Sequence, residues 1–172
     1  NEWKGSDAQK WCTDFAGTTR GAYGYYGITS AFSKQEAAGL IATVKSDNAH
    51  NAGQYNVNFA ASADILNGDK VFFLSAEEAE TYFPAGEKGN SSRTSSGSGQ
   101  GIWWLRSPYK DSSFKVGTIN GSGSVSATQA NYFWGARPAF NLDTNTVLFI
   151  SAAVGGKAEN FNYVSAYTGN EW

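Results

Sequence analysis

The stretch from Gly101 to Tyr109, GIWWLRSPY, gives the strongest indication of the fold. Neighbouring side chains of a strand point to opposite faces of its sheet. One face then carries Trp103, Leu105 and Ser107, and the other carries Trp104, Arg106 and Pro108. Because each face holds a large ring, we predict a central strand covered on both sides, rather than an aromatic patch open to solvent.

The composition favours a loop-rich, partly β domain of an extracellular kind. The 172 residues fit one domain, and a domain of this size buries roughly 70% of the surface that its unfolded chain exposes. Charged residues make up 16% of the chain, well below the usual quarter or so. The net charge is −2 and no two Lys or Arg residues are adjacent, so neither nucleic acid nor an anionic membrane is favoured as a partner.

The apolar runs are short. Val71 to Leu74 and Val147 to Ile150 are among the longest, far below the ~20 residues that cross a bilayer as a helix. We expect no membrane insertion.

Three helices are predicted from a shared start signal, a Ser at the N-cap with Gln or Glu three residues later. The pairs are Ser6 with Gln9, Ser33 with Glu36, and Ser75 with Glu78. The first helix should bury Trp11 and Phe15 and stop at Gly17. The second should present Ala37, Leu40, Ile41 and Val44 as one apolar stripe. The third should end near Phe83, before Pro84.

The remaining apolar segments predict strands. Val71 to Leu74 is expected to be a buried strand before the third helix, and the Gly- and Ser-rich residues 86–101 a long surface loop. Five further strands are expected at 102–107, 114–119, 125–128, 133–142 and 147–153, with a hairpin at Asn120 to Gly123. Helices followed by an antiparallel meander give an α+β fold. We assign one domain to residues 1–153 and a tail or linker to 154–172, within a longer chain that has further domains.

The sequence offers little for catalysis or metal binding. Its one cysteine, Cys12, and its one histidine, His50, lie far apart in the sequence, and nucleophilic or zinc chemistry needs more partners than these. Glu77, Glu78 and Glu80 are interpreted as a solvated helix face. The oxygen-rich run from Asp64 to Asp69 lacks EF-hand spacing and is interpreted as a turn. We predict no catalytic residues, no metal site and no cofactor.

Three ordered motifs resemble those of a known family. They are DKVFFLS at Asp69 to Ser75, followed by Glu77 and Glu78; WLRSP at Trp104 to Pro108; and GARPAFNL at Gly135 to Leu142. The sequence is similar in these motifs to DUF6273, a family of domains in surface proteins of Gram-positive gut bacteria. The resemblance implies a fold distantly similar to C-type lectins and formylglycine-generating enzymes, with short helices packed on a mainly antiparallel twisted sheet and long loops.

The resemblance does not carry the chemistry of those proteins. Formylglycine-generating enzymes need a pair of cysteines, and Ca²⁺-dependent lectins need Glu-Pro-Asn or Gln-Pro-Asp together with Trp-Asn-Asp; the sequence has neither. We therefore expect no such enzyme activity and no Ca²⁺-dependent sugar binding.

The aromatic and arginine residues divide into two groups. A structural signature, in which the two arginines tie loop carbonyls or carboxylates together, is assigned to Trp104, Leu105, Arg106, Ser107, Pro108, Gly135, Arg137 and Pro138. Ligand contact is assigned to the loop residues Tyr109, Asn131, Tyr132 and Trp134, whose rings offer flat stacking faces.

The leading hypothesis is a non-catalytic module of a secreted or cell-surface bacterial protein, adhesin-like, that binds a glycan or a host protein through residues 108–134. A spacer or interaction domain without a ligand of its own is the main alternative. A degenerate enzyme is the third.

Overall fold

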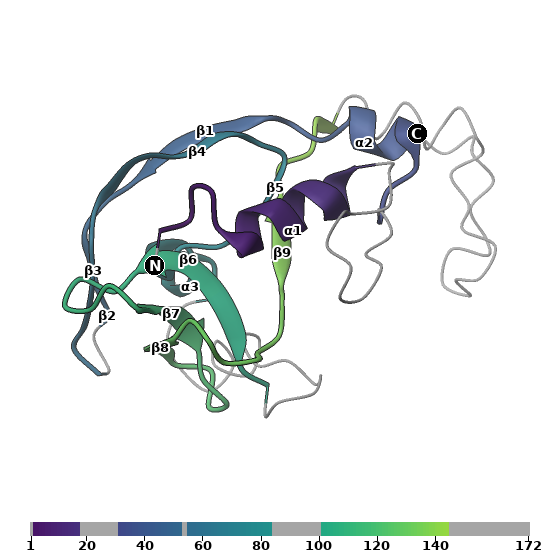
Figure 1. Ribbon diagram of the computed structural model, residues 1–172. Helices are drawn as coiled ribbons and strands as arrows, with labels where there is room; N and C mark the ends of the chain where they lie inside the picture. The colour runs from purple at the N-terminus through teal and green to yellow at the C-terminus, as the bar shows by residue number, and fades with distance from the viewer. Residues whose placement is uncertain (1, 18–30, 53–54, 84–100, 145–172) are drawn as a thin grey trace.

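The computed structural model describes residues 2–17, 31–52, 55–83 and 101–144, and within them the fold is α+β, as predicted (Figure 1). The elements are α1 (Asp7–Ala16), α2 (Lys34–Ala38), β1 (Thr43–Asp47), β2 (His50–Ala52), β3 (Val57–Phe59), β4 (Ser62–Asp69), β5 (Val71–Phe73), α3 (Ala76–Tyr82), β6 (Trp103–Pro108), β7 (Lys115–Ile119), β8 (Val125–Gln129) and β9 (Pro138–Phe140).

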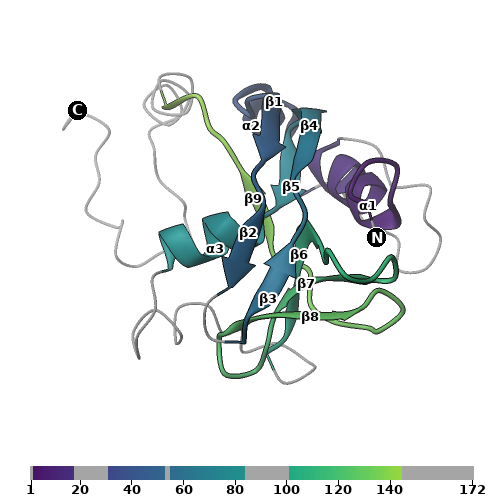
Figure 2. The same cartoon turned by 90° about the vertical axis from the view of Figure 1, so that its left-hand side faces the viewer.

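The strands pair in small antiparallel sheets. β6, β7 and β8 form a three-stranded sheet, and the pairs β1 with β4, β2 with β3, and β5 with β9 form two-stranded ones. The β1–β4 pair arches along one side of the molecule from α2 toward β2 and β3 (Figure 1). Helices α1 and α3 lie on opposite sides of the strands between them (Figure 2).

The three helices begin at the N-cap residues that the sequence predicted, Ser6, Ser33 and Ser75. Ser33 and Ser75 each form a complete capping box with the Glu three residues later. The hydroxyl of Ser6 accepts from the N–H of Gln9, but the Gln9 side chain accepts from the N–H of Gly5 instead of Ser6, so this box is displaced by one residue. Local side-chain to backbone bonding was enough to place all three N-termini.

The length of the second helix was predicted wrongly. α2 ends at Ala38, so the expected stripe of four apolar residues does not exist. Val44 lies on β1 instead and is 68% exposed. Gly39 caps the end of the helix. The next residue, Leu40, forms an antiparallel β-bridge with Leu142 instead of continuing the helix.

The expected order, helices first and strands afterwards, is also wrong. Four strands, β1 to β4, lie between α2 and β5. The run from Asp64 to Asp69, interpreted as a turn, belongs to β4. Strand β1 carries a weak apolar signal because its buried residue is Asp47, a carboxylate that pairs inside the fold.

The later strands agree better with the sequence. β5, β6, β7 and β8 lie where they were predicted, and the turn at Asn120 to Gly123 joins β7 to β8. The strand expected at 133–142 is shorter, since β9 covers Pro138–Phe140. The strand expected at 147–153, the boundary at residue 153 and the loop at 86–101, apart from Gly101, lie outside the described residues.

Two apolar clusters meet at β6. Trp3, Cys12, Phe72 and Phe73 belong to the first, which also receives Trp104. The second contains Trp103 and Leu105 together with Phe59, Ile119 and Val125. Strand β6 is therefore covered on both faces, as its two tryptophans predicted.

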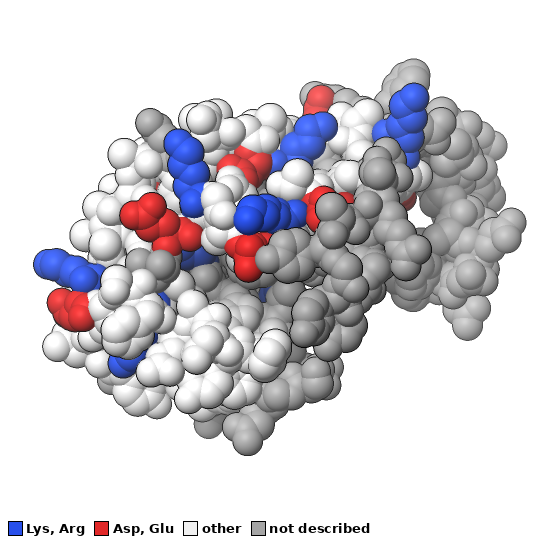
Figure 3. Space-filling view, viewed as in Figure 1, with Lys and Arg blue, Asp and Glu red and all other residues white. Residues whose placement is uncertain are grey.

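No helix of the described part is long and apolar enough to cross a membrane. On the face shown in Figure 3, acidic and basic side chains of the described residues are interspersed, without a large area of one sign.

Candidate functional site

The buried side chain of Arg106 connects three elements of the fold. Its Nε and Nη2 donate to the two carboxylate oxygens of Asp47 at 2.9 and 2.6 Å. Its Nη1 donates to Glu78 Oε2 at 2.6 Å and to the carbonyl oxygen of Phe73 at 2.7 Å. Arg106 thus ties two carboxylates and a backbone carbonyl together.

The electrostatics of this group keep it ionised. Burial alone would raise the pKa of Glu78, but hydrogen bonds and the charge of Arg106, with bonds from Lys45 and Ser75, lower that pKa to about 2. Burial would lower the pKa of Arg106, and its two carboxylate partners outweigh that effect and raise the pKa. Glu78, expected on a solvated helix face, is therefore a buried ion-pair partner, and that expectation is wrong.

The other signature residues hold β6 against its neighbours. The N–H of Trp104 donates to the carbonyl of Gly135 at 3.0 Å, and the guanidinium of Arg137 lies 5.1 Å from the ring centroid of Trp103. The hydroxyl of Ser107 accepts from the N–H of Ala76 at 2.9 Å and anchors the start of α3. Leu105 packs in the second apolar cluster. The carbonyl of Pro108 accepts a hydrogen bond from the N–H of Ala60, and Pro138 of β9 pairs with Phe73 of β5.

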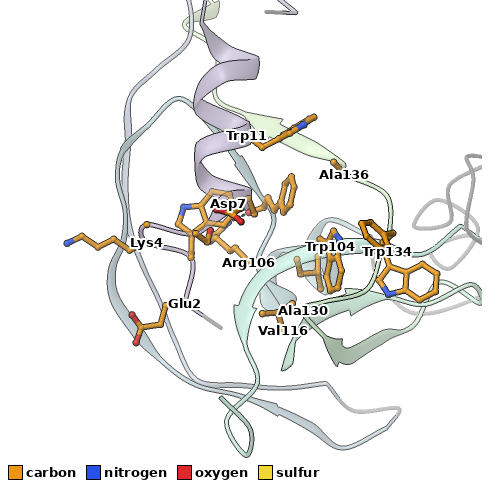
Figure 4. A pocket seen from close by; sticks show the side chains of 17 residues that line it. Glu2, Lys4, Asp7, Trp11, Trp104, Arg106, Val116, Ala130, Trp134 and Ala136 are labelled. Atoms are coloured by element: carbon orange, nitrogen blue, oxygen red, sulfur yellow. Dashed lines mark hydrogen bonds between the residues drawn. The ribbon is translucent and has the colours of Figure 1, made fainter. Parts of the chain in front are cut away.

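A cavity of about 710 Å³ lies next to this network (Figure 4). Three parts of the chain supply its aromatic wall: the N-terminal turn and α1, the strands β5 and β6, and the segment that follows β8. The rings are those of Trp3, Trp11, Phe73, Trp104, Phe133 and Trp134. Arg106 also borders the cavity, and its guanidinium donates to Asp47, Glu78 and the Phe73 carbonyl.

Two indole groups of this wall have buried nitrogens without a partner. Among the described residues, neither Nε1 of Trp3 nor Nε1 of Trp134 has a hydrogen-bond acceptor. A buried N–H that makes no hydrogen bond loses free energy relative to water, typically about 1–3 kcal/mol. Both nitrogens are closed off from solvent as well as from protein acceptors, so they are a cost of packing these rings and not groups that the cavity presents.

Of the four residues predicted to contact a ligand, only Trp134 lines the cavity. Tyr132 stacks on Trp134 with ring centroids 5.7 Å apart and an interplanar angle of 28°. Asn131 is exposed beside them. Tyr109 does not line the cavity, because its ring packs edge-on against Phe59 at 6.5 Å.

Sequence reasoning missed most of the cavity wall. Trp3 received no assignment, Trp11 and Phe73 were treated as core, and Trp104 as signature. Phe133, which is 94% exposed, was placed in a strand that begins only at Pro138. Trp3 and Trp134 are separated by some 130 positions in the sequence, so no local pattern joins them.

The residues considered for catalysis are engaged elsewhere. Burial, and next the charge of Asp69, raise the pKa of the Cys12 thiol, which stays protonated. The ring of His50 lies 2.8 Å from a carboxylate oxygen of Glu80. The described part of the chain contains no group of three or more His, Cys, Asp or Glu side chains arranged to hold a metal ion.

Comparison with known proteins identifies the family. The family described as "Domain of unknown function (DUF6273)" matches residues 1–144. No curated protein and no solved structure matches the chain. The match spans every element from α1 to β9, including the residues of the cavity and of the Arg106 network. The chain therefore belongs to the DUF6273 family.

Proposed function

We propose that this domain is a non-catalytic ligand-binding module of a secreted or cell-surface bacterial protein. The observation that carries the proposal is the aromatic cavity, in which rings from three separate parts of the chain converge. A cavity of about 710 Å³ falls within the size range of pockets that hold small ligands. Its aromatic walls provide large contact area at a low cost in side-chain entropy.

The rim of the cavity supports binding over a purely structural spacer. Phe133, which lines the cavity, is 94% exposed, and its neighbour Tyr132 is 52% exposed. A spacer has no use for rings presented to solvent, whereas adjacent exposed rings are typical of interaction sites. The ring of Tyr132 stacks on that of Trp134, which fixes the orientation of these two rings relative to each other.

We also propose that the fold is distantly C-type-lectin-like. Short helices on two sides of small antiparallel sheets support this assignment. An experimental structure showing a different strand connectivity from that of C-type lectins would contradict it.

Binding is tested with the whole chain on arrays of immobilised glycans and host surface proteins. Trp134→Ala should abolish any specific signal, because it removes a cavity wall and the support of Tyr132. Tyr82→Ala is the matched control, since Tyr82 is an exposed ring on α3 outside the cavity. Silence of the folded wild-type protein on both arrays would favour the spacer.

A further inference from the structure

The sequence contains two asparagines that are followed directly by glycine. Asn67 precedes Gly68 in β4, and Asn120 precedes Gly121 in the turn between β7 and β8. An asparagine in this position loses its side-chain amide more readily than any other, because the nitrogen of the next residue attacks the amide carbon. Glycine has no Cβ to hinder that nitrogen or to restrict the backbone rotation that the attack needs.

The side chain of Asn120 is held by its turn. Its Oδ1 accepts from the N–H of Ser122 at 3.0 Å, from the hydroxyl of Ser122 at 2.7 Å and from the N–H of Ser124 at 2.9 Å. Its backbone N–H donates to the carbonyl oxygen of Ser124, and its own carbonyl oxygen accepts from the N–H of Gly123, each at 2.9 Å. Because the side-chain amide must leave these partners before its carbon can reach the nitrogen of Gly121, the turn protects Asn120.

Asn67 has the opposite surroundings. Asn67 and Gly68 are both exposed. Among the residues that the structure describes, the side-chain amide of Asn67 has no hydrogen-bond partner, while its backbone N–H donates to Asp69 Oδ2 at 2.9 Å. The amide is therefore free to turn toward the main chain.

Gly68 is the extra residue of a bulge in β4. Thr43 pairs with Asp69 and Val44 pairs with Asn67, so Gly68 has no residue opposite it on β1. Its φ is +93°, and nothing lies within 4 Å of the position that a Cβ would take. A bulge interrupts the ladder locally, so a five-membered ring has room to close here.

We propose that Asn67 deamidates spontaneously in the native protein, whereas Asn120 is protected until its turn opens. The backbone nitrogen of Gly68 bonds to Cγ of Asn67, and the bond from Cγ to the side-chain nitrogen breaks. That nitrogen leaves as ammonia, which carries away the proton given up by the Gly68 N–H. Water then opens the resulting succinimide at either carbonyl carbon and leaves aspartate or isoaspartate at position 67.

The products change the β1–β4 arch. Either product adds a negative charge two residues from Asp69, whose carboxylate already accepts from the N–H of Asn67. Isoaspartate also inserts one carbon atom into the main chain of β4 and alters its register with β1. The arch runs along one side of the molecule (Figure 1), and Asn67 and Gly68 do not line the cavity. Deamidation at position 67 therefore leaves the wall of the proposed binding site unchanged.

The test follows both asparagines in the whole chain at mildly alkaline pH, in water enriched in oxygen-18, once in native buffer and once in urea. Deamidation replaces an amino group by a hydroxyl whose oxygen comes from the solvent. After digestion in ordinary water, the masses of the peptides and their fragments therefore identify and locate the reaction. In urea, both asparagines should react at similar rates. In native buffer, Asn67 should react at least about tenfold faster than Asn120, because Asn120 must first give up its hydrogen bonds.

Two results in native buffer overturn the proposal. One is conversion of Asn120 as fast as that of Asn67. The other is a lack of conversion at both positions in native buffer while both react in urea, because Asn67 would then also be protected by the fold.

Three variants examine the assignment of each rate. Asn67→Gln should abolish labelling at position 67, since the longer side chain closes a six-membered ring much more slowly. Asn48→Gln, at another exposed asparagine, is the matched control and should leave labelling of Asn67 unchanged. Ser122→Ala removes one of the three bonds to Oδ1 of Asn120, and should accelerate the reaction there about twofold to tenfold in native buffer. An unchanged rate at Asn120 in Ser122→Ala would overturn the assignment of its protection to these bonds.

Discussion

Arg106 and Asp47 form a two-pronged ion pair inside the fold, with N–O distances of 2.9 and 2.6 Å. Arg106 comes from β6 and Asp47 from the end of β1, 59 positions earlier. The planar guanidinium fits both oxygens of one carboxylate, a geometry that a lysine cannot reproduce. This pair fixes the β1–β4 arch to the strand that borders the cavity.

Asp47→Asn should therefore destabilise the protein strongly. The substitution keeps one acceptor oxygen but leaves the buried guanidinium with less compensating charge, and breaking a buried pair in this way costs about 3–5 kcal/mol. The free energy of unfolding is measured in urea by tryptophan fluorescence. Asp111→Asn, a change at an exposed carboxylate, is the control and should stay within about 0.5 kcal/mol of the wild type. A similarly small change in Asp47→Asn would show that the pair contributes little.

Glu78 should make stability depend on acid pH. Its pKa is about 2 in the folded chain against an ordinary 4.5, so the unfolded chain binds a proton more readily than the folded one does. The stabilisation is then fully present above pH 4.5 and declines as the pH falls from about 4.5 toward 2. Urea unfolding across this range checks the window.

The pair of variants Glu78→Gln and Glu77→Gln isolates this effect. Glutamine retains the capping box at position 78 but not the charge that faces Arg106, so Glu78→Gln should lose stability at pH 7 and converge with the wild type at low pH. Glu77→Gln changes the same charge on the same helix turn without a described bond to Arg106, and should follow the wild-type pH dependence. Equal pH dependence in all three proteins would contradict the assignment.

Local signals of the sequence placed the helix starts, because a Ser cap and its Glu partner are three residues apart and each side chain accepts from the other's backbone N–H, whatever else the Glu contacts. The covered strand β6 followed from the alternation of Trp103 and Trp104. Strand β1 escaped prediction because its inward residue, Asp47, is charged and its burial depends on Arg106, which lies far along the chain. The cavity was not predicted for the same reason, since Trp3, Trp104 and Trp134 come together around it only in the folded chain.

Gly117→Ala should destabilise the β6–β7 pair. A Cβ at this position would lie 3.1 Å from Leu105 Cβ, 3.2 Å from Phe59 Cε1 and 3.3 Å from the carbonyl oxygen of Ser107. Neighbours on three sides, one of them backbone, leave little room for adjustment, and we expect a loss of about 1–3 kcal/mol.

Gly5→Ala is the comparison variant, and the stability of both glycine variants is measured by thermal unfolding. A Cβ there meets nothing within 4 Å, but the backbone φ of +77° disfavours any residue other than glycine, so a loss of about 1 kcal/mol is expected from backbone strain alone. A Gly117→Ala variant as stable as the wild type would show that β6 and β7 separate easily.

Cys12 should resist thiol reagents in the native protein. The side chain is fully buried in the first apolar cluster, and its raised pKa leaves almost no thiolate at neutral pH. Since the sequence has no other cysteine, the reaction with a disulfide reagent reports this position alone. The rate in native buffer should be at least about a hundredfold lower than in urea, because reaction requires the cluster to open.

The double variant Cys12→Ala/Thr13→Cys supplies the control for that experiment. Thr13 is the next residue of α1 and is exposed, so a thiol there should react at a similar rate in native buffer and in urea. Rapid reaction of wild-type Cys12 in native buffer would mean that α1 detaches readily from β5. Because Trp3 and Trp11 line the cavity from this same region, such detachment would also open the proposed binding site.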